Sequence, residues 1–410
     1  MKAIKICVIG LGYVGLPLAI EFGKKFETVG YDKDFLRVKN LRNKIDSNAE
    51  IPKKSFSQLN KILFTTKVEN IRASNFYIIT VPTPITKKKK PDLKIIIDAT
   101  TLVAKKLKRN DIVVFESTVF PGFTEDIAVP ILEKFSCLKF NIDFFCGYSP
   151  ERINPGDKKH TVKNITKVIS GSNPKTLAII KKVYQSILIS KTFSAKSIKI
   201  AEAAKVIENT QRDLNIALIN ELTQLFTKMK LNIYDILKAA NTKWNFLKFT
   251  PGLVGGHCIG VDPYYLTHKA RQIGFNPKVI LAGRKTNDNM SKFYINDFLR
   301  KIKKNKKLKI LILGITFKEN CRDVRNSKVF DMVDLLSKKK HLVHIFDPLA
   351  KKIFNSYSKK IILKKNIKFN FYDGIIIAVA HNFFVKMGIN KIKKYGTKDL
   401  FIYDIKNIFS

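Results

Sequence analysis

A cysteine among glycines and a glycine-rich loop near the start of the chain are the features most suited to chemistry. Cys258 lies in PGLVGGHCIGVD (251–262), and GLGYVG (10–15) directly follows an apolar run. Glycines in this arrangement suit the close approach of a dinucleotide, and a thiol in a turn can act as a nucleophile. A hydride acceptor together with a nucleophilic sulfur predicts oxidation of an alcohol beyond the aldehyde, with the carbon held on sulfur in between.

Gly10, Gly12 and Gly15 stand between a predicted strand and a predicted helix, and Asp32 ends the next strand. This spacing suits a pyrophosphate at a helix N-terminus and a carboxylate on the adenosine ribose. An acid at this position favours NAD over NADP, because it would repel a 2′-phosphate. The alternative interpretation is a glycine turn with a purely structural role.

Three polar residues of the longest predicted helix, Lys205, Asn209 and Arg212, lie on one face at i, i+4 and i+7. A buried lysine and asparagine one turn apart could stabilise an oxyanion. A polar stripe at a domain interface fits the spacing equally well. The neighbouring Glu202 and Glu208 are expected to be solvated or paired at the surface.

Cys258 and its neighbour His257 have structural interpretations as well. A lone cysteine is most often a small buried apolar residue, although Gly255 and Gly256 argue against a regular element here. His257 could be a ligand or a base, and a packing or capping histidine is at least as compatible with the sequence.

The composition limits the classes of function. The chain has 410 residues, enough for two or three domains. No apolar run reaches the roughly 18 residues of a membrane span, and the first residues lead directly into a strand, so we expect neither a membrane segment nor a signal peptide. Five scattered cysteines without CxxC spacing predict a reducing, cytoplasmic location and no metal site.

The net charge of +43 could suggest nucleic-acid binding, yet only 11 of the 76 basic residues are arginines. Nucleic-acid binders favour arginine for bidentate contacts, and the chain has no nucleic-acid-binding signature. We therefore expect no nucleic-acid partner. The charge instead favours an anionic small substrate.

Apolar runs alternate with helical patterns in the first part of the chain, which predicts a parallel, doubly wound α/β sheet. Strands are expected at 4–9, 28–31, 76–81, 112–116, 144–147 and 166–171, and helices at 16–25, 33–40, 93–107, 123–135 and 175–187. Thr83 and Thr118 follow the third and fourth of these strands. They are candidates for cofactor or water contacts, or ordinary strand-end caps.

From residue 197 the pattern becomes helical, with one long helix at 200–229 that could bridge domains or form a dimer interface. Shorter helices are expected at 232–240, 263–273 and 277–303. Strand–helix alternation then returns, with strands at 309–313, 342–346, 374–378 and 400–403. The predicted domains are 1–196, 197–304 and 305–410.

Seven motifs together resemble the nucleotide-sugar 6-dehydrogenase family, which includes the UDP-glucose and GDP-mannose dehydrogenases. They are GLGYVGLPLA (10–19), VPTP (81–84), ESTVFPG (116–122), YSPERINPGD (148–157), AEAAKVIENTQRDLNIALINEL (201–222), PGLVGGHCIGVDPYYL (251–266) and GITFKENCRDVRNS (314–327). The resemblance covers residues 6 to about 404. It implies an NAD-binding Rossmann domain, a long central helix with a helical dimerisation region, and a C-terminal Rossmann-like domain for the nucleotide, assembled as a homodimer.

The resemblance also implies the activity, a four-electron oxidation of a sugar C6 hydroxymethyl to a carboxylate with two NAD⁺. Cys258 matches the nucleophile that forms a thiohemiacetal and then a thioester. Lys205 and Asn209 match the pair that steadies negative charge on the C6 oxygen. Asp262 and Thr118 match residues that hold or activate water.

Further matches supply the binding residues. Glu151 matches an acid proposed as a base or a water activator in thioester hydrolysis, Arg284 an arginine that often reaches the sugar across the dimer, and Lys318 and Arg325 nucleotide-sugar contacts. The assigned NAD contacts are Gly10, Gly12, Tyr13, Val14, Gly15, Asp32, Arg37, Thr83 and Thr118. The assigned substrate contacts are Glu151, Arg152, Lys205, Asn209, Arg212, Phe249, Gly255, Arg284, Lys318 and Arg325.

One departure bears on the substrate. UDP-glucose dehydrogenases generally follow Ser-Pro-Glu with Phe-Leu-x-Glu, whereas Glu151 is followed by Arg152-Ile-Asn-Pro155, so the second glutamate is missing. The sequence looks instead like the branch that acts on UDP-N-acetylglucosamine or UDP-N-acetylgalactosamine, in which Arg152 could reach a phosphate or the acetamido group. The product would supply surface polysaccharide or lipopolysaccharide. The alternatives are a UDP-N-acetylmannosamine or UDP-glucose enzyme, and a non-catalytic nucleotide-sugar binding protein.

Overall fold

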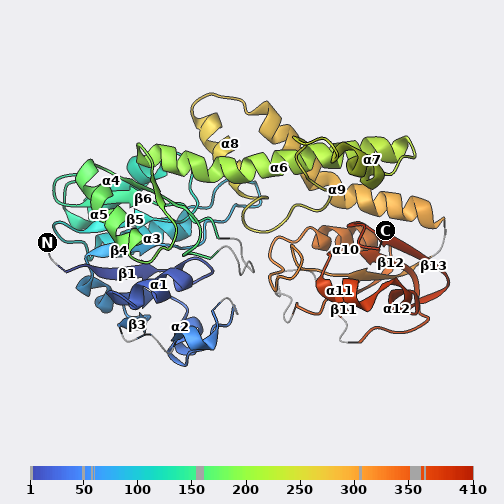
Figure 1. The fold of residues 1–410 in the computed structure, drawn as a ribbon, viewed down its shortest axis with the longest axis horizontal. Coiled ribbons are helices and arrows are strands. Elements are labelled where there is room, and N and C mark those ends of the chain that lie inside the picture. The colour runs from blue at the N-terminus through green and yellow to red at the C-terminus, as the bar shows by residue number, and fades with distance from the viewer. Residues whose placement is uncertain are drawn as a thin grey trace. The chain divides into compact units, whose positions relative to one another are not determined.

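The chain builds two sheets in two separate units (Figure 1). The computed structural model describes residues 3–48, 51–56, 59, 61–153, 161–303, 307–350, 362–363 and 366–409. The first unit comprises Met1–Glu208 with Tyr264–Phe275, and the second comprises Asn209–Pro263 with Asn276–Ser410. The predicted domain boundary between residues 304 and 305 falls on residues outside the described ranges.

The first unit contains an eight-stranded sheet in the order β3-β2-β1-β4-β5-β6-β7-β8. The strands are β1 (Lys5–Ile9), β2 (Glu27–Tyr31), β3 (Ile62–Thr65), β4 (Phe76–Ile79), β5 (Ile112–Phe115), β6 (Phe145–Tyr148), β7 (Lys167–Gly171) and β8 (Thr192–Ser194). The six predicted strands of this unit are present, and β3 and β8 were not predicted. The order of β1 to β5 is that of a doubly wound nucleotide-binding sheet.

One strand pair departs from the predicted parallel sheet, because β6 and β7 are antiparallel. A parallel neighbour needs a long crossover, usually through a helix. No helix occurs between these strands in the part of the connection that the structure describes, and the chain returns in the opposite direction.

Four helices contact strands of this sheet, namely α1 (Gly15–Gly23), α2 (Phe35–Arg42), α3 (Lys94–Ala104) and α5 (Pro174–Gln185). The other helical segments are α4 (Val129–Ser136), which packs on α3, α8 (Asp262–Gln272), η1 (Lys53–Phe56), η2 (Val68–Ala73) and the π-helical η3 (Thr124–Ala128). Local sequence explains several starts. Asp34 caps α2, and Asn173 caps α5 with Pro174 in the first turn.

The long helix predicted at 200–229 is α6 (Ile198–Lys228), a single ribbon in Figure 1 that carries residues of both units. The helices α7 (Ile233–Ala240) and α9 (Lys278–Ile302) also match predicted segments. Among the described residues, no helix combines the length and the apolar character that crossing a membrane requires.

The second unit contains a five-stranded parallel sheet in the order β11-β10-β9-β12-β13. Its elements are β9 (Lys309–Leu313), β10 (Leu342–Phe346), β11 (Ile362–Leu363), β12 (Tyr372–Ile377), β13 (Gly396–Asp404), α10 (Val329–Lys338), α11 (Asn382–Met387) and α12 (Ile389–Lys393). The two-residue β11 was not predicted. The apolar core includes the fully buried residues Phe298, Ile310, Ile312, Met332 and Ile376.

Candidate active site

The glycine loop between β1 and α1 is held against the ends of β2 and β4. Gly10 has a φ of 93°, a conformation that favours glycine, and its N–H donates to the Tyr31 carbonyl at 2.8 Å. A Cβ on Gly15 would lie 1.8 Å from the Gly10 carbonyl oxygen and 2.4 Å from Thr80 Oγ1. These two glycines are therefore required by the protein's own packing.

Gly12 differs, because a Cβ added there would meet no atom within 4 Å. The residue is exposed, and α1 begins three residues later. Nothing in the described protein demands glycine here, so the open space fits a ligand that approaches the backbone. A pyrophosphate at a helix N-terminus has this requirement, and the loop therefore fits the predicted dinucleotide.

The side chains of Asp32 and Arg37 form hydrogen bonds with the backbone of this loop at Leu11. Asp32 accepts hydrogen bonds from Leu11 N at 2.8 Å and Asp34 N at 2.9 Å, which places a half-buried carboxylate at the end of β2. Arg37 is buried, and its Nε donates to the Leu11 carbonyl at 2.9 Å while Nη1 contacts Asp46 at 2.6 Å. The position of Asp32 suits a ribose contact. Arg37 supports the loop backbone, and its contact with NAD stays a prediction.

The threonines predicted at the sheet edge follow adjacent strands. Thr83 follows β4 and Thr118 follows β5, which pairs in parallel with β4, so both lie at the carboxyl edge. Both are half-buried, as are Tyr13 and Val14 in the glycine loop. The Tyr265 hydroxyl of α8 donates to the Pro84 carbonyl at 3.1 Å and supports the segment that carries Thr83.

Glu202 was expected at the surface, and this expectation is wrong. Its carboxylate is fully buried and accepts from Gly122 N at 2.6 Å, Thr124 N at 2.9 Å and Thr124 Oγ1 at 2.7 Å. The first N–H groups of a helix need acceptors, and the Phe123 cap position of η3 offers no side-chain acceptor. Burial raises the pKa of Glu202 to about 7, against the lowering effect of these hydrogen bonds. The sequence signal that could have revealed this role is the phenylalanine at the cap position of η3, which cannot accept the hydrogen bonds that Glu202 accepts.

Lys205 and Glu151 are brought together in the first unit. Both side chains are buried, and Lys205 Nζ donates to the Glu151 backbone carbonyl at 2.7 Å. Glu151 Oε1 accepts from Arg152 N at 2.7 Å and Ile153 N at 2.5 Å. Arg152 in turn pairs with Glu208 at 2.5 Å, which agrees with a paired Glu208. Residues 154–157 of this motif lie outside the described ranges.

The cysteine turn belongs to the second unit. Cys258 is exposed, and its carbonyl accepts from Val261 N at 3.0 Å and Asp262 N at 2.8 Å. Asp262 is buried, and its carboxylate accepts from Asn209 Nδ2 at 2.6 Å. Two predicted catalytic residues are thus in direct contact, and the turn that presents the predicted nucleophile is bonded to one of them.

The glycines before Cys258 allow the turn to pack on the segment at 314–327. A Cβ on Gly255 would lie 2.5 Å from the Asn326 carbonyl oxygen, and one on Gly256 would lie 2.6 Å from a Phe317 ring carbon. Gly256 also has a φ of 82°. The role of Gly255 that the structure supports is therefore close packing, and its contact with substrate stays a prediction.

His257 lies beside the predicted nucleotide-sugar residues. Its Nε2 is 3.3 Å from Asp323 Oδ2, but the two atoms are not aligned for a hydrogen bond. Arg325 donates hydrogen bonds to the same carboxylate oxygen from Nε and Nη2. Burial by itself raises the pKa of Asp323, but His257 and Arg325 outweigh it and hold this pKa well below its usual range. Lys318 is half-buried, with Nζ 5.8 Å from the centre of the Phe317 ring.

Three other predicted substrate residues are dispersed within the second unit. Arg284 is buried, with Nη1 2.6 Å from Asp213 and Nη2 2.6 Å from Asp288. Arg212 is exposed, and Phe249 packs on a small apolar cluster around Leu237. The carboxylates around Arg284 fix its guanidinium inside its own chain. The sugar contacts of these residues stay predictions.

The two Rossmann-type sheets and a loop that fits a dinucleotide define the class, an NAD-dependent dehydrogenase. The chain belongs to the UDP-glucose/GDP-mannose dehydrogenase family, whose NAD binding, central and UDP binding domains match residues 4–188, 199–289 and 311–410. The predicted family, the NAD cofactor and a UDP-linked substrate are thereby confirmed.

Relatives and a solved structure match the chain over its length. UDP-N-acetyl-D-glucosamine 6-dehydrogenase of Pseudomonas aeruginosa is 50% identical, with 99% of this chain and 97% of the relative covered. The enzyme of the same name from Salmonella typhi is 51% identical, with 99% and 96% covered. The structure of UDP-D-ManNAc dehydrogenase from Pyrococcus horikoshii has a TM-score of 0.86 at 30% identity, with 99% and 96% covered.

Proposed function

We propose that the protein is an NAD-dependent UDP-N-acetylhexosamine 6-dehydrogenase that oxidises UDP-N-acetylglucosamine or its C4 epimer to the uronate. The observation that carries this proposal is the exposed Cys258 in a turn bonded to the Asn209–Asp262 pair. The names and the full-length similarity of the two bacterial relatives support the acetamido sugar. A role in supplying uronic acid units for surface polysaccharide or lipopolysaccharide would follow from this product.

The first half of the reaction takes the C6 alcohol to the aldehyde. Bound NAD⁺ supplies the acceptor for the hydride that leaves C6 in each of two oxidations. In our proposal Lys205 and Asn209 hold the C6 oxygen as it releases its proton to solvent and gains negative charge. The Cys258 sulfur then bonds to the aldehyde carbon, and the thiol proton passes to the carbonyl oxygen to give the thiohemiacetal.

The second half takes the thiohemiacetal to the acid. Loss of a second hydride from C6, with release of the proton on its oxygen to solvent, leaves a thioester on Cys258. A water oxygen bonds to the acyl carbon, the carbon–sulfur bond breaks, and the sulfur leaves as a thiolate. One water proton passes to Glu151, and the product acid releases the other to solvent. Asp262 and Thr118 are proposed to orient this water.

A panel of UDP-sugars tests the substrate. We expect about two NADH for each UDP-N-acetylglucosamine or UDP-N-acetylgalactosamine consumed, as a four-electron oxidation requires. About two NADH from UDP-glucose with none from the acetamido sugars would refute the assignment. UDP-N-acetylmannosamine is the second candidate, supported by the likeness to the Pyrococcus horikoshii structure, and the same panel separates it.

We also propose that the protein forms a homodimer through its central helices. Leu218 and Leu225 lie on one face of α6, Met229 directly follows the helix, and each of the three is at least half exposed. A stripe of large exposed apolar side chains marks an interaction surface. Light scattering should give the mass of two chains, and Leu225→Glu should reduce it to one. Leu63→Glu, at an exposed leucine of β3, is the matched control, and a monomeric wild-type chain would contradict the proposal.

The three-domain division at 1–196, 197–304 and 305–410 is also proposed, and the spacing of the family's domain matches supports it. A cytoplasmic location is proposed as well. None of the five cysteines, all of which lie in the described ranges, forms a disulfide, as expected in a reducing compartment.

A further inference from the structure

A buried charge cluster lies behind Glu151 in the first unit. Lys167 Nζ is 2.5 Å from Glu116 Oε2 and 3.6 Å from Glu151 Oε2, and the Tyr184 hydroxyl donates to the other oxygen of Glu116. All four residues are at most 8% exposed. One ammonium group thus faces two carboxylates, which come from the end of β5 and from the segment after β6.

Burying these charged groups costs free energy, because buried ions lose their hydration. Burial raises the pKa of Glu116 to about 7; Lys167 opposes this shift and Glu151 adds to it. Burial by itself lowers the pKa of Lys167, but the carboxylates of Glu116 and Glu151 raise it overall. Lys167 therefore stays positively charged and pairs with both Glu116 and Glu151.

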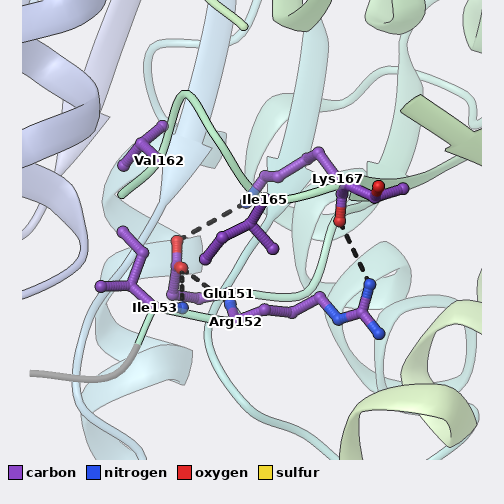
Figure 2. Close-up of a pocket in the computed structure, with 7 residues that line it drawn as sticks. Glu151, Arg152, Ile153, Val162, Ile165 and Lys167 are labelled. Carbon is purple, nitrogen blue, oxygen red and sulfur yellow. Dashed lines mark hydrogen bonds and ion pairs between the residues drawn. The ribbon is translucent and has the colours of Figure 1, made fainter. Parts of the chain in front are cut away.

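The two oxygens of Glu151 have different surroundings. Oε1 accepts from the backbone N–H groups of Arg152 and Ile153. Oε2 is buried and accepts no hydrogen bond from the described residues, with Lys167 as its ion-pair partner. Figure 2 shows Glu151 in a pocket whose lining includes Val162, Ile165 and Lys167. The side chain is thus held through one oxygen, and the other has room to accept a proton.

We propose that Lys167, held by Glu116 and Tyr184, is a positioning residue that orients the Glu151 carboxylate so that Oε2 can accept the proton of the hydrolytic water. This inference rests on the proposed function. Without the ammonium, Oε2 would lose its ion-pair partner at 3.6 Å, and the carboxylate would no longer be held in place from this side. The step affected is cleavage of the thioester, and both hydride transfers precede it.

Lys167→Met tests this role. It should still form NADH in a first turnover but accumulate the acyl enzyme on Cys258, which intact mass spectrometry detects. The steady-state rate should fall roughly 100-fold, the order expected when a general base is disabled. A purely structural defect would lower the first-turnover formation of NADH as well, and the acyl enzyme would not accumulate.

Two further variants keep the test decisive. Glu116→Gln/Lys167→Met removes both charges of the buried pair, so it folds without an isolated buried carboxylate at residue 116 and should still accumulate the thioester. Lys163→Met removes a neighbouring lysine that pairs with Glu21 at the surface and should match the wild type.

The absence of an accumulated acyl enzyme in both the single and the double variant would overturn the role of Lys167. Failure of the proposed function has a different signature, because the wild type itself would then form no NADH with any UDP-sugar. That outcome would also overturn this inference.

Discussion

The carboxylate of Glu202 accepts hydrogen bonds from both the backbone N–H and the hydroxyl of Thr124, at 2.9 and 2.7 Å. Helix α6 thereby caps the start of another helical segment 78 residues earlier in the chain. Glu202 lies one turn before Lys205 on α6, and Thr124 follows the segment that carries Thr118. The contact therefore joins two parts of the proposed catalytic machinery within the first unit.

Glu202 should make stability depend on pH. Because burial raises its pKa to about 7, the folded state binds the proton more tightly than the unfolded state. The contribution of Glu202 to stability is then present below pH 4.5 and is lost as pH rises to about 7, by up to about 3 kcal/mol. Glu202→Gln does not titrate, so the wild type should exceed it in Tm by more at pH 5 than at pH 8.

Thermal unfolding at the two pH values measures this difference. Glu221→Gln, at an exposed position of the same helix, should keep the wild-type dependence on pH. An equal gap between wild type and Glu202→Gln at both pH values would contradict the expectation.

Cys258→Ser should lower the rate of net uronate formation at least about 1,000-fold, because a hydroxyl is a weaker nucleophile and a poorer leaving group than a thiolate. The fold and NAD binding should be retained, since Cys258 is exposed. NADH formation and a fluorescence titration with NAD measure the two quantities. Cys137→Ser, at the other exposed cysteine, is the control, and unchanged uronate production by Cys258→Ser would remove the thioester mechanism.

Asp262→Ala should lower kcat about 100-fold with a smaller change in KM, because Asn209 Nδ2 loses its acceptor at 2.6 Å and its amide is no longer oriented. Steady-state kinetics at saturating NAD⁺ give both constants. Asn215→Ala removes an amide of α6 that bonds only the Gln211 carbonyl of its own helix among the described contacts, and it should behave as wild type. Equal losses in the two variants would argue against a specific role for the Asn209–Asp262 pair.

Local patterns predicted most of the fold because apolar strands and amphipathic helices bury continuous stretches of chain. The strand β8 has three residues with two exposed side chains, so its sequence carries no apolar signal. The antiparallel β6–β7 pair depends on the route of the connection between the strands, which composition does not encode.

The site was predictable where residues share one element and much less so where distant segments meet. Helical spacing placed Lys205 and Asn209 on one face of α6. The partner of Asn209, Asp262, is 53 residues away, and its role came only from the family resemblance. Glu202 and Lys167 were missed because their partners are backbone groups or side chains on other elements, and a charged residue in isolation is indistinguishable from a surface one.

Substitutions at two glycines of the loop at 10–15 should distinguish an effect on NAD binding from an effect on folding. Gly12→Ala places its methyl group in open space and should leave Tm unchanged while weakening NAD binding at least about tenfold, because the methyl would occupy the space that the pyrophosphate needs. Gly15→Ala drives its Cβ to 1.8 Å from the Gly10 carbonyl oxygen and should lower Tm as well. Calorimetric titration with NAD and thermal unfolding measure the two effects. If Gly12→Ala bound NAD as tightly as the wild type, the dinucleotide would not approach the backbone at this residue, and the proposed placement of the cofactor would be wrong.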